Sequence, residues 1–233
     1  HLILLAKNNT GYKNLIKIIS IANLEGYYYR PRTDIELLRQ FSNGLICLSA
    51  CVNGYISDPL IQNQEETAVK RAEVLYKIFG EGNFYLELQK HINVEDQDIL
   101  NEKLIALSKK MGLPLVATND NHYIYNTDAE AQEILLCIQT QTALNTPNRK
   151  LSMISSPDFY MKSQEEMKGL FIQTQTALEN TSRIADMCNV EISLGKWIMP
   201  IFDVPNNKTP QEFMKNKVEE GLKNRYKEIT REI

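Results

Sequence analysis

The chain has 233 residues, of which 43% are hydrophobic and 24% charged, a composition typical of a soluble globular protein with a sizeable core. Its formal net charge of −3 argues against a domain that mainly neutralises a phosphate backbone, because such binding relies on clustered Lys and Arg. The sequence contains no run of 18 apolar residues and no secretory signal. We therefore expect a cytoplasmic protein that does not enter a membrane.

Short apolar runs alternate with amphipathic segments through the first 140 residues. The apolar runs predict buried strands at residues 1–7, 44–50, 84–88 and 113–118. The segments between and after them predict helices that end near Gly26 and that span 65–79, 95–111 and 128–139. Four such strand-helix units favour an α/β fold around a parallel sheet or barrel, in which chemistry collects at the C-terminal ends of the strands.

The pattern changes after Pro147. Residues 147–162 lack periodicity, and helices are predicted at 165–170 and 177–188. A Pro-containing extended connector follows at 195–205, and a final amphipathic helix spans 209–229 with a capping signature from Thr209 to Glu212. We expect a domain boundary near residue 195.

The four cysteines are widely spaced, which favours free thiols over a disulfide scaffold. Cys47, Cys137 and Cys188 stand among apolar residues, where a buried thiol usually acts as a small hydrophobic side chain. Cys51 follows the second apolar run. There, a buried small residue and a metal ligand are equally plausible interpretations.

Candidate metal ligands follow the ends of predicted strands. Asp120 and His122 are two residues apart on an extended stretch, so their side chains face the same way. A carboxylate and an imidazole suit zinc or manganese, although such a pair in a loop is more often a hydrogen-bonded turn. Cys51 would add a thiolate, and His1 would join if it faces the same loops rather than being a disordered terminal residue.

Two further features have weaker functional interpretations. His91 follows the third predicted strand and is a secondary candidate for a position near the metal. The cluster Tyr27–Tyr29, with Arg30 and Arg32, could stack on bases or contact phosphate, but packing as a loop on the barrel rim is the favoured interpretation. A Gly-rich phosphate loop, a nucleophile elbow and a CxxC pair are all missing from the sequence, which excludes several enzyme classes.

The order of these motifs resembles that of the alpha subunits of bacterial DNA polymerase III. The resemblance is collinear and rests on residues 1–12, 44–51, 84–89, 113–122, 128–131, 177–181 and 188–190. It implies that residues 1–195 are the C-terminal part of a PHP domain, a distorted (β/α)7 barrel whose first strands are missing here. It also implies that residues 196–233 are a connector and the start of the polymerase palm. By position, His1, Cys51, Asp120 and His122 match metal ligands of that family.

The resemblance implies a parent chain that is a DNA-directed DNA polymerase and carries out template-directed synthesis. Its PHP domain would be phosphoesterase-like, hold zinc or manganese, and have 3′–5′ exonuclease activity when complete. The alternative is a non-catalytic scaffold that stabilises the polymerase and docks the proofreading exonuclease subunit. The implied partners are DNA, that subunit and other holoenzyme subunits.

Several elements of the family pattern would lie outside this chain. The family's His-x-His pair and other ligands would precede residue 1, and the palm carboxylates with their magnesium would follow residue 233. We therefore expect this piece to be inactive and to bind metal weakly or not at all. A third interpretation, a free-standing PHP phosphatase, is disfavoured by the palm-like segment after Gly195.

Overall fold

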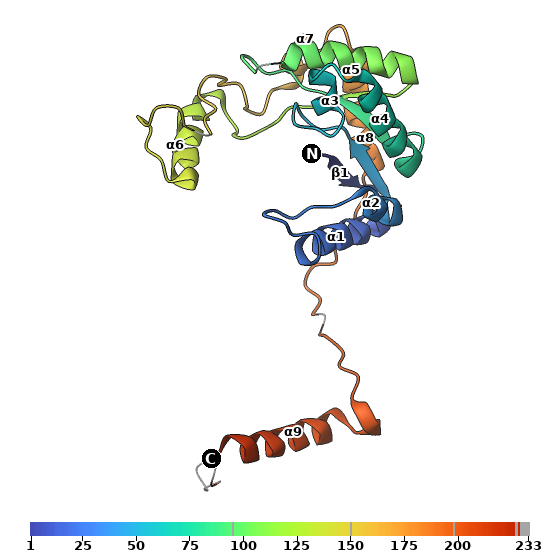
Figure 1. Ribbon diagram of the computed structural model, residues 1–233, viewed down its shortest axis with the longest axis vertical. Coiled ribbons are helices and arrows are strands. Elements are labelled where there is room, and N and C mark those ends of the chain that lie inside the picture. Colours follow the sequence, from blue (N-terminus) through green and yellow to red (C-terminus); the bar gives the residue numbers. More distant parts are fainter. Residues whose placement is uncertain (95, 150, 198, 227, 229–233) are drawn as a thin grey trace. The chain divides into compact units, whose positions relative to one another are not determined.

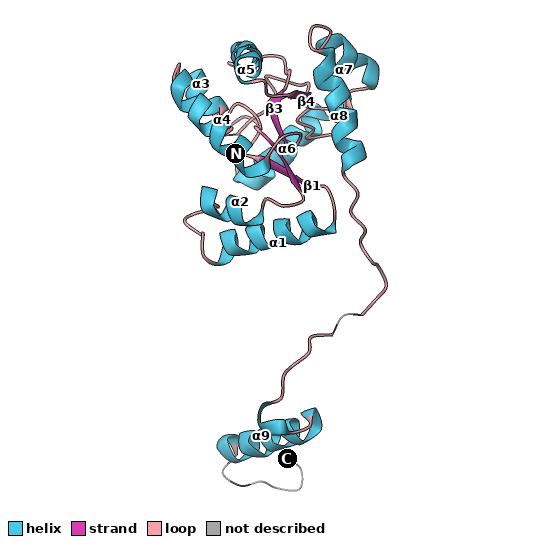
Figure 2. Cartoon of the chain, turned by 90° about the vertical axis from the view of Figure 1, so that its right-hand side faces the viewer, coloured by secondary structure: helices cyan, strands magenta, loops and turns pink. Residues whose placement is uncertain are grey.

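The computed structural model describes residues 1–233 except 95, 150, 198, 227 and 229–233, and it divides into two compact units, His1–Glu191 and Ile192–Ile233. The first unit contains a four-stranded sheet in the order β1-β2-β3-β4, drawn in magenta in Figure 2. Its strands are β1 (Ile3–Ala6), β2 (Leu45–Leu48), β3 (Phe84–Leu88) and β4 (Leu115–Ala117). The four predicted strands are therefore confirmed, β3 with its predicted bounds and the other three with shorter ones.

The sheet is not fully parallel. Strands β2, β3 and β4 run parallel, but β1 pairs antiparallel with β2, with Ile3 opposite Leu48. Two helices, α1 (Asn9–Leu24) and α2 (Ile35–Phe41), connect β1 to β2. The second helix, which the sequence did not predict, returns the chain to the end of β1, so β2 begins beside the place where β1 stops. The Lys7 N–H donates to Gly44 O at 2.8 Å at this turn.

Burial follows the position of each strand in the sheet. Strands β2 and β3 are buried throughout, as expected of inner strands. Strand β1 is only half-buried, and Ile3 is 40% exposed. The expectation of a fully buried first strand was wrong because, among the described residues, β1 has a single neighbouring strand.

Helices cover both faces of the sheet. Helix α4 (Glu65–Phe79) packs against β2 and β3, α5 (Gln97–Met111) against β3, and α8 (Gln175–Met187) against β4. Side chains of β2 alternate between the two faces, because Leu45 and Cys47 join one hydrophobic cluster while Ile46 and Leu48 join the other. Ile184 of α8 belongs to the second cluster.

The helix that covers β4 is not the one that follows it in sequence. Helix α6 (Ala129–Thr140) packs against the 3-10 turn η1 (Asn126–Asp128) and lies apart from the strands in Figure 1. Instead, Asn180 and Thr181 of α8 donate side-chain hydrogen bonds to Leu115 O and Ala117 O, at 2.8 and 2.7 Å. These bonds occupy the edge of β4, so the expected fourth strand-helix unit is formed with a different helix.

The remaining elements of the first unit are short. Helix α3 (Ser57–Ile61) was not predicted, and α7 (Gln164–Leu170) was. All four cysteines are free thiols, as expected. Cys47 and Cys137 are buried, whereas Cys188 is only half-buried.

The second unit contains η2 (Pro205–Asn207) and α9 (Pro210–Arg225). The Thr209 side chain accepts from Glu212 N, and the Glu212 carboxylate accepts from Thr209 N, which confirms the predicted capping box. Helix α9 ends at Arg225, earlier than predicted, and residues 95 and 229, where two helix ends were placed, lie outside the described residues. None of the described helices combines the length and apolar character required to span a bilayer.

Candidate metal centre

Three candidate residues occupy equivalent places at one edge of the sheet. Cys51, His91 and Asp120 each follow by three residues the last residue of a parallel strand, β2, β3 and β4 respectively. Because these strands are parallel, their C-terminal ends meet at the same edge. The sequence predicted the candidate metal ligands at this edge.

His1 reaches this edge because β1 is antiparallel. The start of β1 lies beside the end of β2, and the His1 ring is close to the Cys51 side chain, with 3.8 Å between Nδ1 and Sγ. The loop after Cys51 holds His1 through its backbone, since Tyr55 N donates to His1 O and His1 N donates to Asn53 O, both at 3.0 Å. A parallel β1 would have put His1 at the opposite edge of the sheet.

The turn that presents Cys51 has two unusual backbone features. Ala50 adopts a left-handed conformation with φ 64°, which few residues other than glycine adopt. At Gly54 the chain passes so close to the strand end that an added Cβ would lie 2.3 Å from Ser49 O. The turn is therefore tight, and its course depends on specific supporting contacts.

Asp120 and His122 form the second pair. Their Oδ2 and Nε2 atoms are 3.3 Å apart, and their side chains are 45% and 38% exposed. The backbone of the pair is anchored to the 147–162 segment, because His122 N donates to Phe159 O at 2.8 Å and Asn119 Nδ2 donates to Tyr160 O at 2.6 Å. The two side chains thus point toward one another and remain accessible to a ligand.

Both separations suit two ligands of one metal ion. With Zn–S of about 2.3 Å and Zn–N or Zn–O of about 2.0 to 2.1 Å, a tetrahedral angle places S and N about 3.6 Å apart and N and O about 3.3 Å apart. The measured separations are 3.8 Å for Cys51 with His1 and 3.3 Å for Asp120 with His122. Within the described residues, no group of three or more His, Cys, Asp and Glu side chains could hold a metal ion. The structure thus brings the four predicted ligands together as two pairs, and a shared coordination sphere stays a prediction.

A buried carboxylate that the sequence did not single out lies between the two pairs. Glu87, in β3, is only 4% exposed. Its Oε2 accepts from Ala50 N at 3.0 Å, and its Oε1 accepts from Thr118 Oγ1 at 2.5 Å. Burial raises the pKa of Glu87, and the Asp120 charge adds to this rise, while the hydrogen bonds from Thr118, Gln89 and Ala50 oppose it. The network joins the ends of β2, β3 and β4.

His91 is the centre of a second buried group. Its ring is stacked on Phe159, with centroids 4.2 Å apart, and Phe159 in turn meets the His122 ring edge to face at 5.5 Å. His91 Nδ1 lies 3.6 Å from Asp158 Oδ1, and neither ring nitrogen has a hydrogen-bond partner among the described residues. Burial lowers the pKa of His91, against the opposing effect of the Asp158 charge. The position of His91 near the metal was a secondary hypothesis and stays one, and Asp158 and its neighbour Lys162 had no signal in the sequence.

Comparison with known proteins shows which proteins this chain resembles. Residues 1–91 match the family model described as the PHP domain, a range that includes β1, β2, β3, His1 and Cys51. The whole chain is 47% identical over 235 residues to DNA polymerase III subunit alpha of Borreliella burgdorferi, of which it covers 20%. It is 40% identical over 234 residues to the same subunit of Treponema pallidum, also covering 20%, and 97% of it aligns at 38% identity with 19% of that of Thermus aquaticus.

The chain is homologous to one segment of the alpha subunits of DNA polymerase III. The resemblance seen in the sequence is therefore confirmed, and the chain spans about one fifth of the length of the curated relatives it matches. The alignment includes residues 192–233 as well as the first unit, because it covers 100% of the chain.

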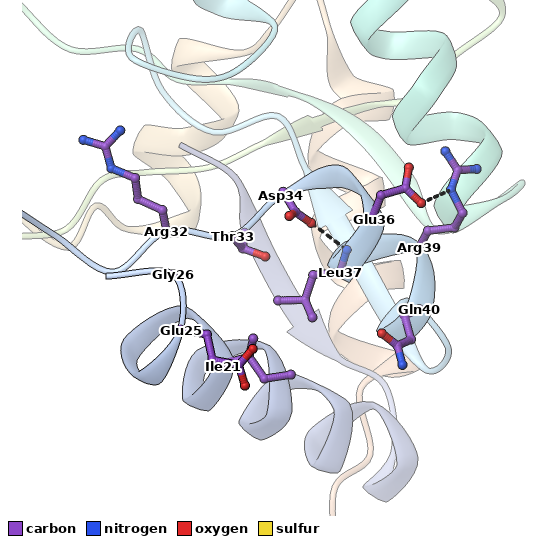
Figure 3. A pocket seen from close by; sticks show the side chains of 10 residues that line it. All are labelled: Ile21, Glu25, Gly26, Arg32, Thr33, Asp34, Glu36, Leu37, Arg39 and Gln40. Carbon is purple, nitrogen blue, oxygen red and sulfur yellow. Dashed lines mark hydrogen bonds and ion pairs between the residues drawn. The ribbon is translucent and has the colours of Figure 1, made fainter. Parts of the chain in front are cut away.

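One cavity of the first unit has none of the candidate ligands in its lining. It has a volume of about 690 Å³ and is lined by residues of α1, α2 and the loop between them (Figure 3). Three of its charged side chains have structural roles, since Asp34 caps α2 by accepting from Leu37 N at 2.8 Å and Glu36 pairs with Arg39 at 3.6 Å. These contacts are local to α2 and give no indication of a ligand.

The Tyr27–Tyr29 loop beside this cavity is not packed on a rim. The three tyrosine residues are 62%, 63% and 80% exposed, and the Arg32 guanidinium lies 5.3 Å from the centroid of the Tyr28 ring. The favoured interpretation of this loop as a packed one was therefore wrong.

Proposed function

We propose that this chain is part of the alpha, catalytic, subunit of a bacterial replicative DNA polymerase III whose parent chain carries out template-directed DNA synthesis. In this proposal residues 1–195 belong to the PHP domain, and residues 196–233 form the connector and the start of the palm. The observation that carries it is 47% identity over 100% of the chain, including the segment that follows the PHP-like unit. A free-standing phosphatase would not need that segment.

The complete domain, in our proposal, is a distorted (β/α)7 barrel with a divalent metal site of zinc or manganese. His1, Cys51, Asp120 and His122 would contribute four of its ligands. Support comes from the two close pairs at the C-terminal edge of the sheet and from donor separations that suit a tetrahedral ion. Further ligands would come from sequence that precedes residue 1 in the parent, and the magnesium of the polymerase site would be held outside this chain.

Each pair has a distinct chemical role in this site. Cys51 offers a soft thiolate beside the His1 imidazole, a combination that favours zinc, whereas the Asp120 carboxylate offers a harder oxygen that also suits manganese. Bound ions of this kind activate water and neutralise charge on a phosphodiester. The family resemblance implies 3′–5′ exonuclease activity for the complete domain, and the exposure of Asp120 and His122 is compatible with a substrate at this site.

A scaffold role is the second candidate. The described residues alone hold no group of three potential ligands, and a domain of this kind can stabilise the polymerase and dock the proofreading exonuclease subunit without metal. In both versions the partners are DNA, bound through the parent polymerase, and other holoenzyme subunits, and the location is the cytoplasm.

The two versions differ in what the parent protein holds and does. Purified full-length parent protein is analysed for zinc and manganese by mass spectrometry and for degradation of 3′-labelled single-stranded DNA. If the domain is catalytic, the parent protein contains bound metal and degrades the DNA. Both the metal content and the rate of degradation then fall in Cys51→Ala and in Asp120→Asn, while polymerase activity persists. The matched control, Cys188→Ala, removes a half-buried thiol of the second hydrophobic cluster and should leave both unchanged. Metal-free parent protein without nuclease activity would support the scaffold instead.

A further inference from the structure

Glu87 is a carboxylate in an apolar strand. The other residues of β3 are Phe84, Tyr85, Leu86 and Leu88, and all five are buried. Burying a carboxylate is unfavourable unless hydrogen bonds satisfy its oxygens. Both carboxylate oxygens of Glu87 accept hydrogen bonds here, so the surroundings of this position suit a polar side chain.

The partners of Glu87 are the segments that carry the candidate ligands. Ala50, whose N–H donates to Oε2 at 3.0 Å, immediately precedes Cys51. Thr118, whose hydroxyl donates to Oε1 at 2.5 Å, stands two residues before Asp120. One carboxylate therefore connects the turn after β2 to the turn after β4.

Neighbouring contacts make this connection rigid. Glu87 N donates to Ser49 Oγ at 2.8 Å, which gives β3 a second link to the end of β2. Gln89 Nε2 donates to Glu87 Oε1 at 3.2 Å and fixes the orientation of the carboxylate. The bond to Ala50 N also supports the left-handed backbone that turns the chain into Cys51.

We propose that Glu87 is a positioning residue, which holds the Cys51 turn and the Asp120 turn in the relative placement that lets both ligand pairs serve one metal centre. This inference rests on the metal site proposed above. A leucine would fill the same volume without the cost of burying a carboxylate, but it could not join two turns through directed hydrogen bonds.

Cobalt binding by the full-length parent protein tests this role. Cobalt(II) is added to metal-free protein, its dissociation constant is measured, and the thiolate-to-cobalt charge-transfer absorption reports whether Cys51 is a ligand. Glu87→Leu should weaken cobalt binding roughly 10- to 100-fold, the usual effect of losing a residue that orients metal ligands, and should diminish the thiolate band. Glu87→Gln, which can accept from Ala50 N and donate to Thr118, should restore most of the affinity and the band.

Two further variants separate positioning from stability. Leu86→Val shortens a fully buried neighbour in the same strand and should lower stability without affecting cobalt affinity or the thiolate band. Thr118→Val removes one of the two links, keeps the side-chain size, and should give an intermediate loss of affinity even if Glu87→Leu does not fold.

The failures of the two proposals are distinguishable. Wild-type affinity and an unchanged band in both Glu87→Leu and Thr118→Val would overturn the positioning role alone. Wild-type parent protein that binds no cobalt would overturn the metal site itself and this inference with it.

Discussion

The imidazole of His91 lies flat on the ring of Phe159, with an interplanar angle of 13° and centroids 4.2 Å apart. The Asp158 carboxylate beside it is already well supplied with donors, including Ile92 N at 3.1 Å and Lys162 Nζ at 3.5 Å. His91 therefore contributes mainly apolar packing within this part of the chain. It connects the end of β3 to the segment that anchors His122.

The stability of the chain should fall in mild acid because of His91. Burial lowers the pKa of His91 below its ordinary value of 6.5, so the unfolded chain takes up the proton more readily than the folded chain. As the pH falls through the ordinary pKa of histidine toward the lower pKa of His91 in the folded chain, the free energy of unfolding decreases. Urea unfolding at several pH values between about 8 and 5 measures this loss, which spans the ordinary titration range of histidine.

In His91→Leu the same pH series should be flatter, because the leucine fills the space without a titrating group. Asp158 keeps its other donors in this variant. An equally steep loss of stability in wild type and variant would show that other groups cause it.

Gly11 should not tolerate a side chain. It lies in the first turn of α1 against the turn before β2, and an added Cβ would be 1.9 Å from Gly44 O, a backbone atom that cannot move aside cheaply. We expect Gly11→Ala to lower the free energy of unfolding by about 1 to 3 kcal/mol, as overpacking typically does.

Gly169, in α7, is the matched control for Gly11. Its added Cβ would meet nothing within 4 Å, so Gly169→Ala should stabilise the chain by about 0.5 to 1 kcal/mol through reduced backbone entropy. Urea midpoints of the two variants should therefore move in opposite directions. Equal shifts would mean that the close approach of Gly11 to Gly44 does not exist in solution.

The sequence predicted most of the elements because their apolar patterns are continuous. Strand β3 and helix α4 were predicted with their observed bounds. Helices α2 and α3 were not predicted, and α3 has only five residues, too few for a helical period to be visible. Missing α2 also concealed the antiparallel β1, since only a second helix brings the chain back to the end of that strand.

The candidate site was predictable to a similar, partial extent. Asp120 and His122 share a face because side chains alternate along extended backbone, and this local rule needs no tertiary information. Cys51 and His1 were candidates from their places beside predicted strands and through family resemblance, but their contact depends on the direction of β1. Glu87 resembled an ordinary polar residue of a strand. Its role appears only when the ends of β2 and β4 are placed on either side of it.

The left-handed backbone of Ala50 should be a site of removable strain. A non-glycine residue in this conformation costs roughly 1 to 2 kcal/mol, and Ala50 has φ 64°. Ala50→Gly should therefore raise the free energy of unfolding by about 1 kcal/mol while retaining the N–H bond to Glu87. The control is Ala106→Gly on an exposed face of α5, which should lower it by about 1 kcal/mol. Destabilisation by Ala50→Gly would indicate that the turn relaxes to another conformation in solution.

Arg149 should stabilise the excursion formed by α6 and the 147–162 segment. Its guanidinium pairs with the buried Glu133 carboxylate and donates to Cys137 Sγ at 2.7 Å. Since α6 packs on η1 rather than on the sheet, loss of this pair should open the excursion locally with little change in global unfolding. In Arg149→Met we expect alkylation of Cys137 by iodoacetamide to become at least about tenfold faster, which corresponds to about 1.4 kcal/mol of lost local stability.

Cys47 is the internal control for this measurement. It lies in β2, fully buried, and burial raises the pKa of its thiol, so its alkylation should stay slow in both proteins. Mass spectrometry of digested, alkylated protein resolves the two cysteines. Faster alkylation of both cysteines would reveal global destabilisation. An unchanged rate at Cys137 would show that the excursion does not depend on Arg149. Its main anchors would then be Ser152 Oγ and Met153 N, which also donate to Glu133.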